Sequence, residues 1–156
     1  MPALRSRFRE LQTQVHPDKF VNGTDEERRY AMHATAFLNE AYDTLKNPRL
    51  RARYLLKLKG IEFSEESATT NDINYLMEQM EIRESIEEAE NADDPFAELD
   101  QLKKIIKSRQ QDVENDFRKG YEQGDFESAR QAVLKLRFCE RIFSEIQRIE
   151  ERLDDF

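Results

Sequence analysis

His16, Pro17 and Asp18 are consecutive and combine two side chains that could do chemistry with a residue that would hold them in place. A histidine offers two ring nitrogens, and an ionised aspartate accepts hydrogen bonds from charged donors. Proline fixes the backbone and prevents a helix from running through this point. We therefore expect His16 and Asp18 to be displayed at a stiff corner, where they could bind a charged surface of another protein.

Two other uses of these residues remain open. His16 could act as a general base oriented by Asp18, but the sequence offers no nucleophile, no second acid and no plausible pocket beside them. Alternatively, the two side chains could merely close a turn and cap the next segment. Cys139 is the only cysteine, which leaves no thiolate cluster for a metal or an iron–sulfur site. We expect no catalytic residue, no metal site and no cofactor in this chain.

The loop must be positioned by the helices on either side of it. Pro17 disfavours helical geometry at the residue before it, which ends the first helix near Val15. Thr24 and Glu27 form a capping box that opens a second helix, and Asn47-Pro48 ends that helix. A third, basic helix is expected from Arg49 to Lys59. Apolar residues recur at helical spacing in the first helix at Leu4, Phe8, Leu11 and Val15, and in the second at Ala34, Phe37/Leu38, Ala41 and Leu45.

The remainder of the chain predicts three more helices. Asn71 or Asp72 caps the first, Asp93-Asp94-Pro95 begins the second, and Asp125 caps the third after a break at Gly120 and Gly124. The inward faces of the last two are expected to be Leu99, Leu102, Ile106, Val113 and Phe117, and Ala129, Val133, Leu136, Phe143, Ile146 and Leu153. The fold class is therefore all-α, with a helical hairpin in residues 1–60, a linker at 61–70 and a three-helix bundle in 71–156.

Charge also divides the chain into two parts. Residues 1–60 hold 12 Lys/Arg against 7 Asp/Glu, whereas residues 61–156 hold 13 against 26, which suggests two parts with different partners. A nucleic-acid binder would normally place its positive charge on the larger surface, so nucleic acid is not an expected partner. No apolar run approaches the roughly 20 residues of a membrane span and no signal segment is visible, so we expect a cytoplasmic protein without membrane contact.

The residues around the His-Pro-Asp tripeptide resemble a known family. The upstream match is Phe8-Arg9-Glu10-Leu11, and the downstream match is Phe37-Leu38-Asn39-Glu40-Ala41-Tyr42-Asp43-Thr44-Leu45 with Asn47-Pro48, Arg51 and Tyr54. This arrangement resembles the second, third and fourth helices of a J domain. Lys19-Phe20, the linker length and the acidic bundle, with Leu76-Met77-Glu78-Gln79-Met80-Glu81 and Arg137-Phe138, extend the resemblance over nearly the whole chain to the HscB co-chaperones of iron–sulfur cluster assembly.

This resemblance implies a partner for the loop. J-domain proteins dock on a heat-shock-70-type chaperone and stimulate its ATPase, and here the partner would be HscA-like, with ATP and magnesium belonging to that partner. The implied chaperone-binding residues are His16, Pro17, Asp18, Arg5, Arg9 and Lys19. J domains usually begin with one further helix, and Met1 lies almost inside the second helix, so we expect that first helix to be absent from this sequence.

The helix from Ile73 to Ala89 carries two apolar faces. At about 100° per residue, Tyr75, Ile82, Ile86 and Ala89 gather on one side, and Ile73, Leu76, Met77 and Met80 gather on the other. Only one side can face the bundle. The resemblance implies that the other side binds an IscU-like scaffold through Leu76, Met77, Met80, Glu81, Glu84, Glu88 and Phe138. Phe138, like Leu134, is expected to lie off the inward face of its own helix. Alternatively, Ile73, Leu76 and Met77 could pack against the hairpin.

We therefore expect a co-chaperone, and not an enzyme. It would bring the scaffold to its chaperone, trigger ATP hydrolysis there and promote cluster transfer. Two alternatives remain: a general J-domain protein whose bundle binds other clients, and a scaffold adaptor that does not stimulate an ATPase.

Overall fold

The computed structural model describes residues 2–66, 68, 70 and 72–155, and every regular element among them is a helix. The described residues form two compact units, one extending to Leu55 and the other beginning at Leu56. The predicted all-α fold is confirmed.

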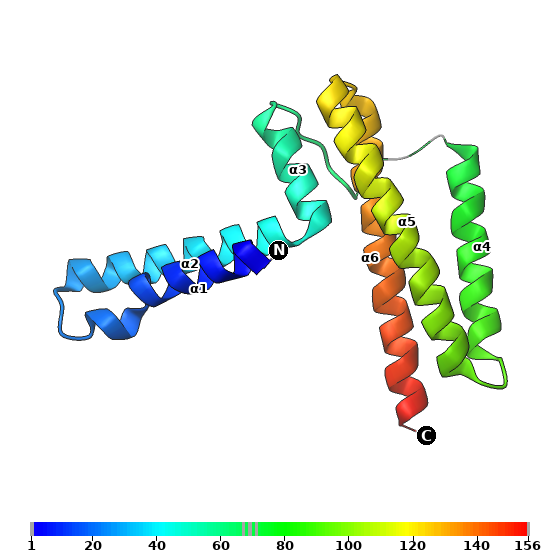
Figure 1. Ribbon diagram of the computed structural model, residues 1–156, viewed down its shortest axis with the longest axis horizontal. Coiled ribbons are helices and arrows are strands. Elements are labelled where there is room, and N and C mark those ends of the chain that lie inside the picture. The colour runs from blue at the N-terminus through cyan, green and yellow to red at the C-terminus, as the bar shows by residue number, and fades with distance from the viewer. Residues whose placement is uncertain (1, 67, 69, 71, 156) are drawn as a thin grey trace. The chain divides into compact units, whose positions relative to one another are not determined.

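The first unit is built on a helical hairpin. α1 (Pro2–Val15) and α2 (Asp25–Lys46) run side by side and are joined through a short 3-10 helix, η1 (Pro17–Phe20) (Figure 1). The ring of Phe8 stacks on that of Tyr42 with centroids 4.1 Å apart. The Thr35 hydroxyl donates a hydrogen bond to the backbone carbonyl of Val15 at 3.3 Å. The second contact holds the N-terminal end of the loop that carries His16 and Asp18, and the first joins α1 to α2 farther from the loop.

The prediction for the apolar face of α2 was partly wrong. Ala31 is buried and Leu38 is half-buried, but Phe37 is exposed. α1 packs on the side of α2 that carries Ala31, Leu38 and Tyr42. Phe37 precedes Leu38 by one residue, and that single step turns its side chain about 100° away from α1.

The connection between the hairpin and the bundle begins with α3 (Pro48–Leu58). The Asn47 side chain accepts a hydrogen bond from the backbone N–H of Leu50 at 3.0 Å, so this residue caps α3 as well as ending α2. Gly60 has a φ of +79°, which glycine adopts without strain. The boundary between the two units falls inside α3, between Leu55 and Leu56. The described residues of 61–70 contain no helix and belong to the second unit, where Glu65 is buried.

The second unit contains the predicted three-helix bundle of α4 (Ile73–Glu90), α5 (Pro95–Gln123) and α6 (Phe126–Asp154). Each helix begins at an aspartate whose carboxylate accepts a backbone N–H three residues on: Asp72 from Tyr75 at 3.1 Å, Asp94 from Ala97 at 3.2 Å, and Asp125 from Ser128 at 3.2 Å. The alternative cap, Asn71, lies outside the described residues. The bundle core includes the predicted residues Leu99, Ile106, Val133, Leu136 and Ile146.

The turn between α5 and α6 depends on two glycines. Gly124 has a φ of +74° and ends α5 in the left-handed conformation. A Cβ atom at Gly120 would lie 3.1 Å from the Asp125 carbonyl oxygen and 3.2 Å from the Ala129 amide nitrogen, so the absence of a side chain permits the close approach of the two helices. α4 packs against the two helices that this turn joins.

Candidate partner-binding surfaces

The His16–Asp18 corner is exposed and internally ordered. His16 is the N-cap of η1, and its Nδ1 atom accepts a hydrogen bond from the Asp18 backbone N–H at 3.2 Å. In a neutral imidazole this leaves the proton on Nε2. The side chains of His16 and Asp18 are 49% and 88% exposed. One oxygen of the Asp18 carboxylate also lies 3.6 Å from the same Nδ1 atom. The corner therefore offers one ring N–H donor and one exposed carboxylate.

The basic residues predicted to accompany this corner are also exposed. Arg5 and Arg9 are one helical turn apart on α1, and Lys19 lies in η1. Arg7, on a different side of α1, is paired with Glu10 at 3.0 Å. Arg5, Arg9 and Lys19 are thus available to an acidic surface in the same unit as the His16–Asp18 corner.

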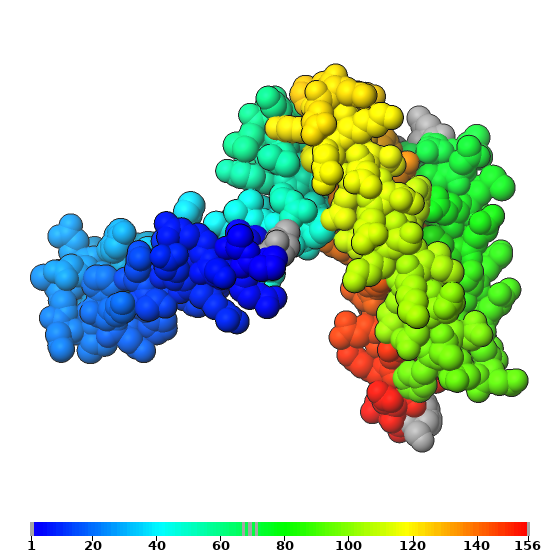
Figure 2. Space-filling view, viewed as in Figure 1, coloured from blue at the N-terminus to red at the C-terminus, as the bar shows by residue number. Residues whose placement is uncertain are grey.

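α4 has the two apolar faces that the sequence predicts. Tyr75, Ile86 and Ala89 are buried in the bundle core. On the opposite side, Leu76, Met77 and Met80 are 43%, 55% and 64% exposed, and Ile73 is exposed beside them. Glu81, Glu84 and Glu88 are exposed further along the helix. We call the surface formed by Ile73, Leu76, Met77 and Met80 the outer α4 face. It is an apolar strip that continues into acidic residues. Figure 2 shows α4 in green at the edge of the bundle.

Ion pairs between helices hold α4 in this orientation. Glu78 contacts Arg109 of α5 at 2.6 Å, Arg83 contacts Glu145 of α6 at 3.3 Å, and Glu90 pairs with Arg152 of α6. At the N-terminus of α4, Asp72 lies 3.7 Å from Lys135. Partly exposed pairs contribute little stability individually. However, they lie on both flanks of α4, so together they favour the rotation that turns Leu76, Met77 and Met80 outward.

The predicted position of Phe138 was wrong. This residue is only 9% exposed and belongs to the bundle core. Its ring meets that of Tyr75 edge-on, with centroids 6.0 Å apart and an interplanar angle of 84°. The reason is that α6 packs against α4 as well as α5, so it buries a second face that a single inward stripe does not predict. Leu134, by contrast, is half-buried.

Burial also makes the remaining reactive groups of this region inert. It raises the pKa of the Cys139 thiol to about 11 and that of the Tyr75 hydroxyl to about 12. At neutral pH the thiol is therefore protonated and a poor nucleophile or metal ligand. Among the described residues, no group of three or more His, Cys, Asp or Glu side chains is placed to hold a metal ion.

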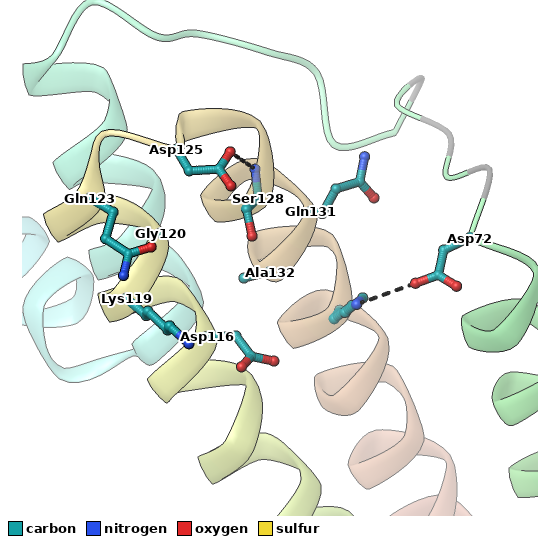
Figure 3. A pocket seen from close by; sticks show the side chains of 10 residues that line it. Asp72, Asp116, Lys119, Gly120, Gln123, Asp125, Ser128, Gln131 and Ala132 are labelled. Atoms are coloured by element: carbon teal, nitrogen blue, oxygen red, sulfur yellow. Dashed lines mark hydrogen bonds and ion pairs between the residues drawn. The ribbon is translucent and has the colours of Figure 1, made fainter.

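A polar cavity of about 440 Å³ lies at the α5–α6 turn, beside the start of α4 (Figure 3). Its walls carry carboxylates and ammonium groups together, including Asp72, Asp116, Lys119 and Lys135. Two of these groups form an ion pair, since Asp72 Oδ2 lies 3.7 Å from Lys135 Nζ. Ligand pockets are predominantly apolar with a few polar groups. The lining of this cavity therefore differs from the mainly apolar lining that is typical of ligand pockets.

Comparison with known proteins extends over nearly the whole chain. The co-chaperone protein HscB homolog of Shewanella halifaxensis is 39% identical over 155 residues, covering 97% of this chain and 89% of that protein. The homolog from Shewanella loihica is 40% identical over 153 residues, covering 96% and 88%. The chain belongs to the HscB co-chaperone family.

Solved HscB structures share the fold as well as the sequence. Chaperone HscB from Vibrio cholerae matches with a TM-score of 0.83 and 35% identity, over 96% of this chain and 88% of that one. Human co-chaperone protein HscB matches with a TM-score of 0.81 and 34% identity, over 92% and 71%. Residues 71–147 match the family model described as the HSCB C-terminal oligomerisation domain. HscB proteins are co-chaperones, and not enzymes.

The sequence did not reveal the residues that orient the outer α4 face in this HscB protein. Glu78 and Arg109 are separated by 31 residues, and Arg83 and Glu145 by 62. Charged residues are abundant in all three helices, so nothing in their spacing selects these partners. In the described part of the chain, no helix is long and apolar enough to cross a membrane.

Proposed function

We propose that this HscB protein binds an IscU-like scaffold through the outer α4 face and brings it to an HscA-like chaperone of the heat-shock-70 type. Through the His16–Asp18 corner it then stimulates that chaperone's ATPase and promotes cluster transfer. ATP and magnesium belong to the chaperone, and the iron–sulfur cluster is cargo.

The observation that carries this proposal is the presence of two exposed surfaces of different chemistry on separate units of one HscB chain. One is the polar, basic corner of His16, Asp18 and Lys19, which suits an acidic partner surface. The other is the apolar outer α4 face with its acidic continuation. Exposed apolar patches rimmed by polar residues commonly mark protein-binding sites. A protein with both can contact two partners at once.

The acidic continuation has a role of its own in this proposal. Glu81, Glu84 and Glu88 are exposed and would face a basic patch on the scaffold. Charges at the rim of an interface accelerate association and make it salt-dependent more than they increase affinity. The apolar residues would then supply most of the binding free energy, and the carboxylates would supply rate and orientation.

Two separate measurements test the proposal. Calorimetry with a purified IscU-type scaffold tests client binding, and a steady-state assay of an HscA-type chaperone tests ATPase stimulation. Both should be positive. Stimulation without scaffold binding would favour a general J-domain protein with other clients, and scaffold binding without stimulation would favour an adaptor.

A further inference from the structure

Phe138 is covered on one flank by an exposed, charged side chain. Its ring lies in the core beside Tyr75, and the guanidinium carbon of Arg83 lies 5.9 Å from the ring centroid. Arg83 is held by Glu145, with Nη1 3.3 Å from Oε2. The Arg83 side chain is 55% exposed. Phe138 is therefore shielded on this flank by an exposed arginine rather than by packed apolar side chains.

The position of Arg83 connects this cover with the outer α4 face. Arg83 follows Met80 by three residues and Leu76 by seven, so the three side chains share one side of α4. It is also the only basic residue in the α4 sequence, which contains six glutamates. Arg83 is therefore a lone cation on an acidic helix. It lies over the Phe138 ring, at the edge of the outer α4 face.

The cover is weak enough to open. An exposed ion pair and an exposed cation–π contact are each worth no more than about a fivefold change in an equilibrium. Displacement of Arg83 would also leave the backbone of α4 and its inward residues in place. Opening would therefore expose the Phe138 ring next to Leu76 and Met80 without unfolding the bundle.

We propose that Arg83, held by Glu145, covers Phe138 in the free protein and swings aside when the client docks. Phe138 then extends the apolar surface formed by Leu76, Met77 and Met80. This inference rests on the proposed scaffold binding. It makes Arg83 and Glu145 positioning residues that set how much of the apolar binding surface is exposed before the client binds.

The Glu145→Gln variant tests the cover in binding. Glutamine keeps the size of the side chain and removes the charge that holds Arg83. The apparent affinity of a site is its intrinsic affinity multiplied by the fraction of molecules in the open form. Loosening the cover raises that fraction, so scaffold affinity should increase by about three- to fivefold. Calorimetry with an IscU-type scaffold should show this gain in the full chain. When both the Glu145 protein and the Glu145→Gln protein carry Phe138→Leu, their scaffold affinities should be equal.

Glu78→Gln is the matched control, because it breaks the ion pair to Arg109 on the other flank of α4 and leaves Arg83 in place. It should give no gain in affinity. Equal or weaker binding by Glu145→Gln, or the same gain in the Phe138→Leu background, would overturn the proposal.

A second measurement needs no scaffold. The chain labelled with 4-fluorophenylalanine gives a ¹⁹F signal for Phe138 that is assigned by its loss in Phe138→Leu. In Glu145→Gln this signal should become more sensitive to a soluble paramagnetic agent, and in Glu78→Gln it should not. An unchanged signal would refute the cover even if the scaffold binds. Increased sensitivity in a protein that fails to bind scaffold would instead reject the proposed function and retain the cover.

Discussion

The imidazole of His16 accepts a hydrogen bond from the backbone N–H of Asp18 at 3.2 Å, so the two functional side chains of the loop are connected through the main chain. Neither side chain is buried. Their orientation comes from Pro17 and η1, and their exposed polar atoms are left for a partner.

This arrangement predicts separable effects for substitutions in the loop. His16→Gln or Asp18→Asn should abolish stimulation of an HscA-type ATPase, because each removes a group offered to the chaperone. Both residues are exposed, so the melting temperature and the scaffold affinity should remain those of the wild type. ATPase stimulation by His16→Gln at the wild-type level would refute this use of the loop.

Substitutions in the outer α4 face should have the opposite effect and weaken scaffold binding. Leu76→Ala, Met77→Ala and Met80→Ala together should increase the Kd for an IscU-type scaffold at least about 30-fold, since burial of each side chain contributes roughly 1.5–3 kcal/mol. The three side chains are exposed, so the thermal midpoint should change little. Ile105→Ala, at an exposed apolar position on α5, is the control and should bind normally. A collapse in stability of the triple variant would place these residues in a core instead.

Phe138 should behave as a core residue in a stability measurement. Phe138→Ala should lower the free energy of unfolding by about 3–5 kcal/mol, because it leaves a cavity beside Tyr75. Urea denaturation measures the loss, and Leu76→Ala on the exposed side of the bundle should cost far less. Equal effects of the two substitutions would contradict the burial of Phe138.

Alkaline pH should destabilise the second unit through Cys139. Its pKa is about 11 in the folded protein and near 9 when unfolded, so the thiol ionises only in the unfolded chain as pH rises above 9. The stabilisation is complete below pH 9 and is lost toward pH 11. Between pH 8 and 10, the unfolding free energy should fall by about 1 kcal/mol. Under reducing conditions, Cys139→Ala should show a smaller fall over this range, and an identical fall would exclude the thiol as the cause.

Local sequence signals predicted much of the fold correctly. Thr24, Asp94 and Asp125 begin helices as expected, since each capping hydrogen bond joins residues only three positions apart. The two faces of α4 also followed from helical periodicity. Which face turns outward depends on partners in α5 and α6 that no local pattern identifies.

Two predictions of buried faces were wrong because they depend on where the neighbouring helices lie. A single stripe was assigned to α6, but this helix contacts both α4 and α5, which buries Phe138. In α2, Phe37 and Leu38 are adjacent apolar residues, and the position of α1 decides between them. The Arg83–Glu145 pair depends on the same tertiary arrangement, so no local sequence pattern identifies it.

The ATPase rate of an HscA-type chaperone, measured with the full chain and an IscU-type scaffold together, tests the central claim most directly. The account predicts that the two proteins together stimulate hydrolysis more than the sum of their separate effects, because one chain brings the client to the chaperone. The loop variant His16→Gln and the outer-face triple variant should each remove this synergy, and they should not restore it when mixed. Purely additive stimulation, or synergy that survives in either variant, would contradict the account.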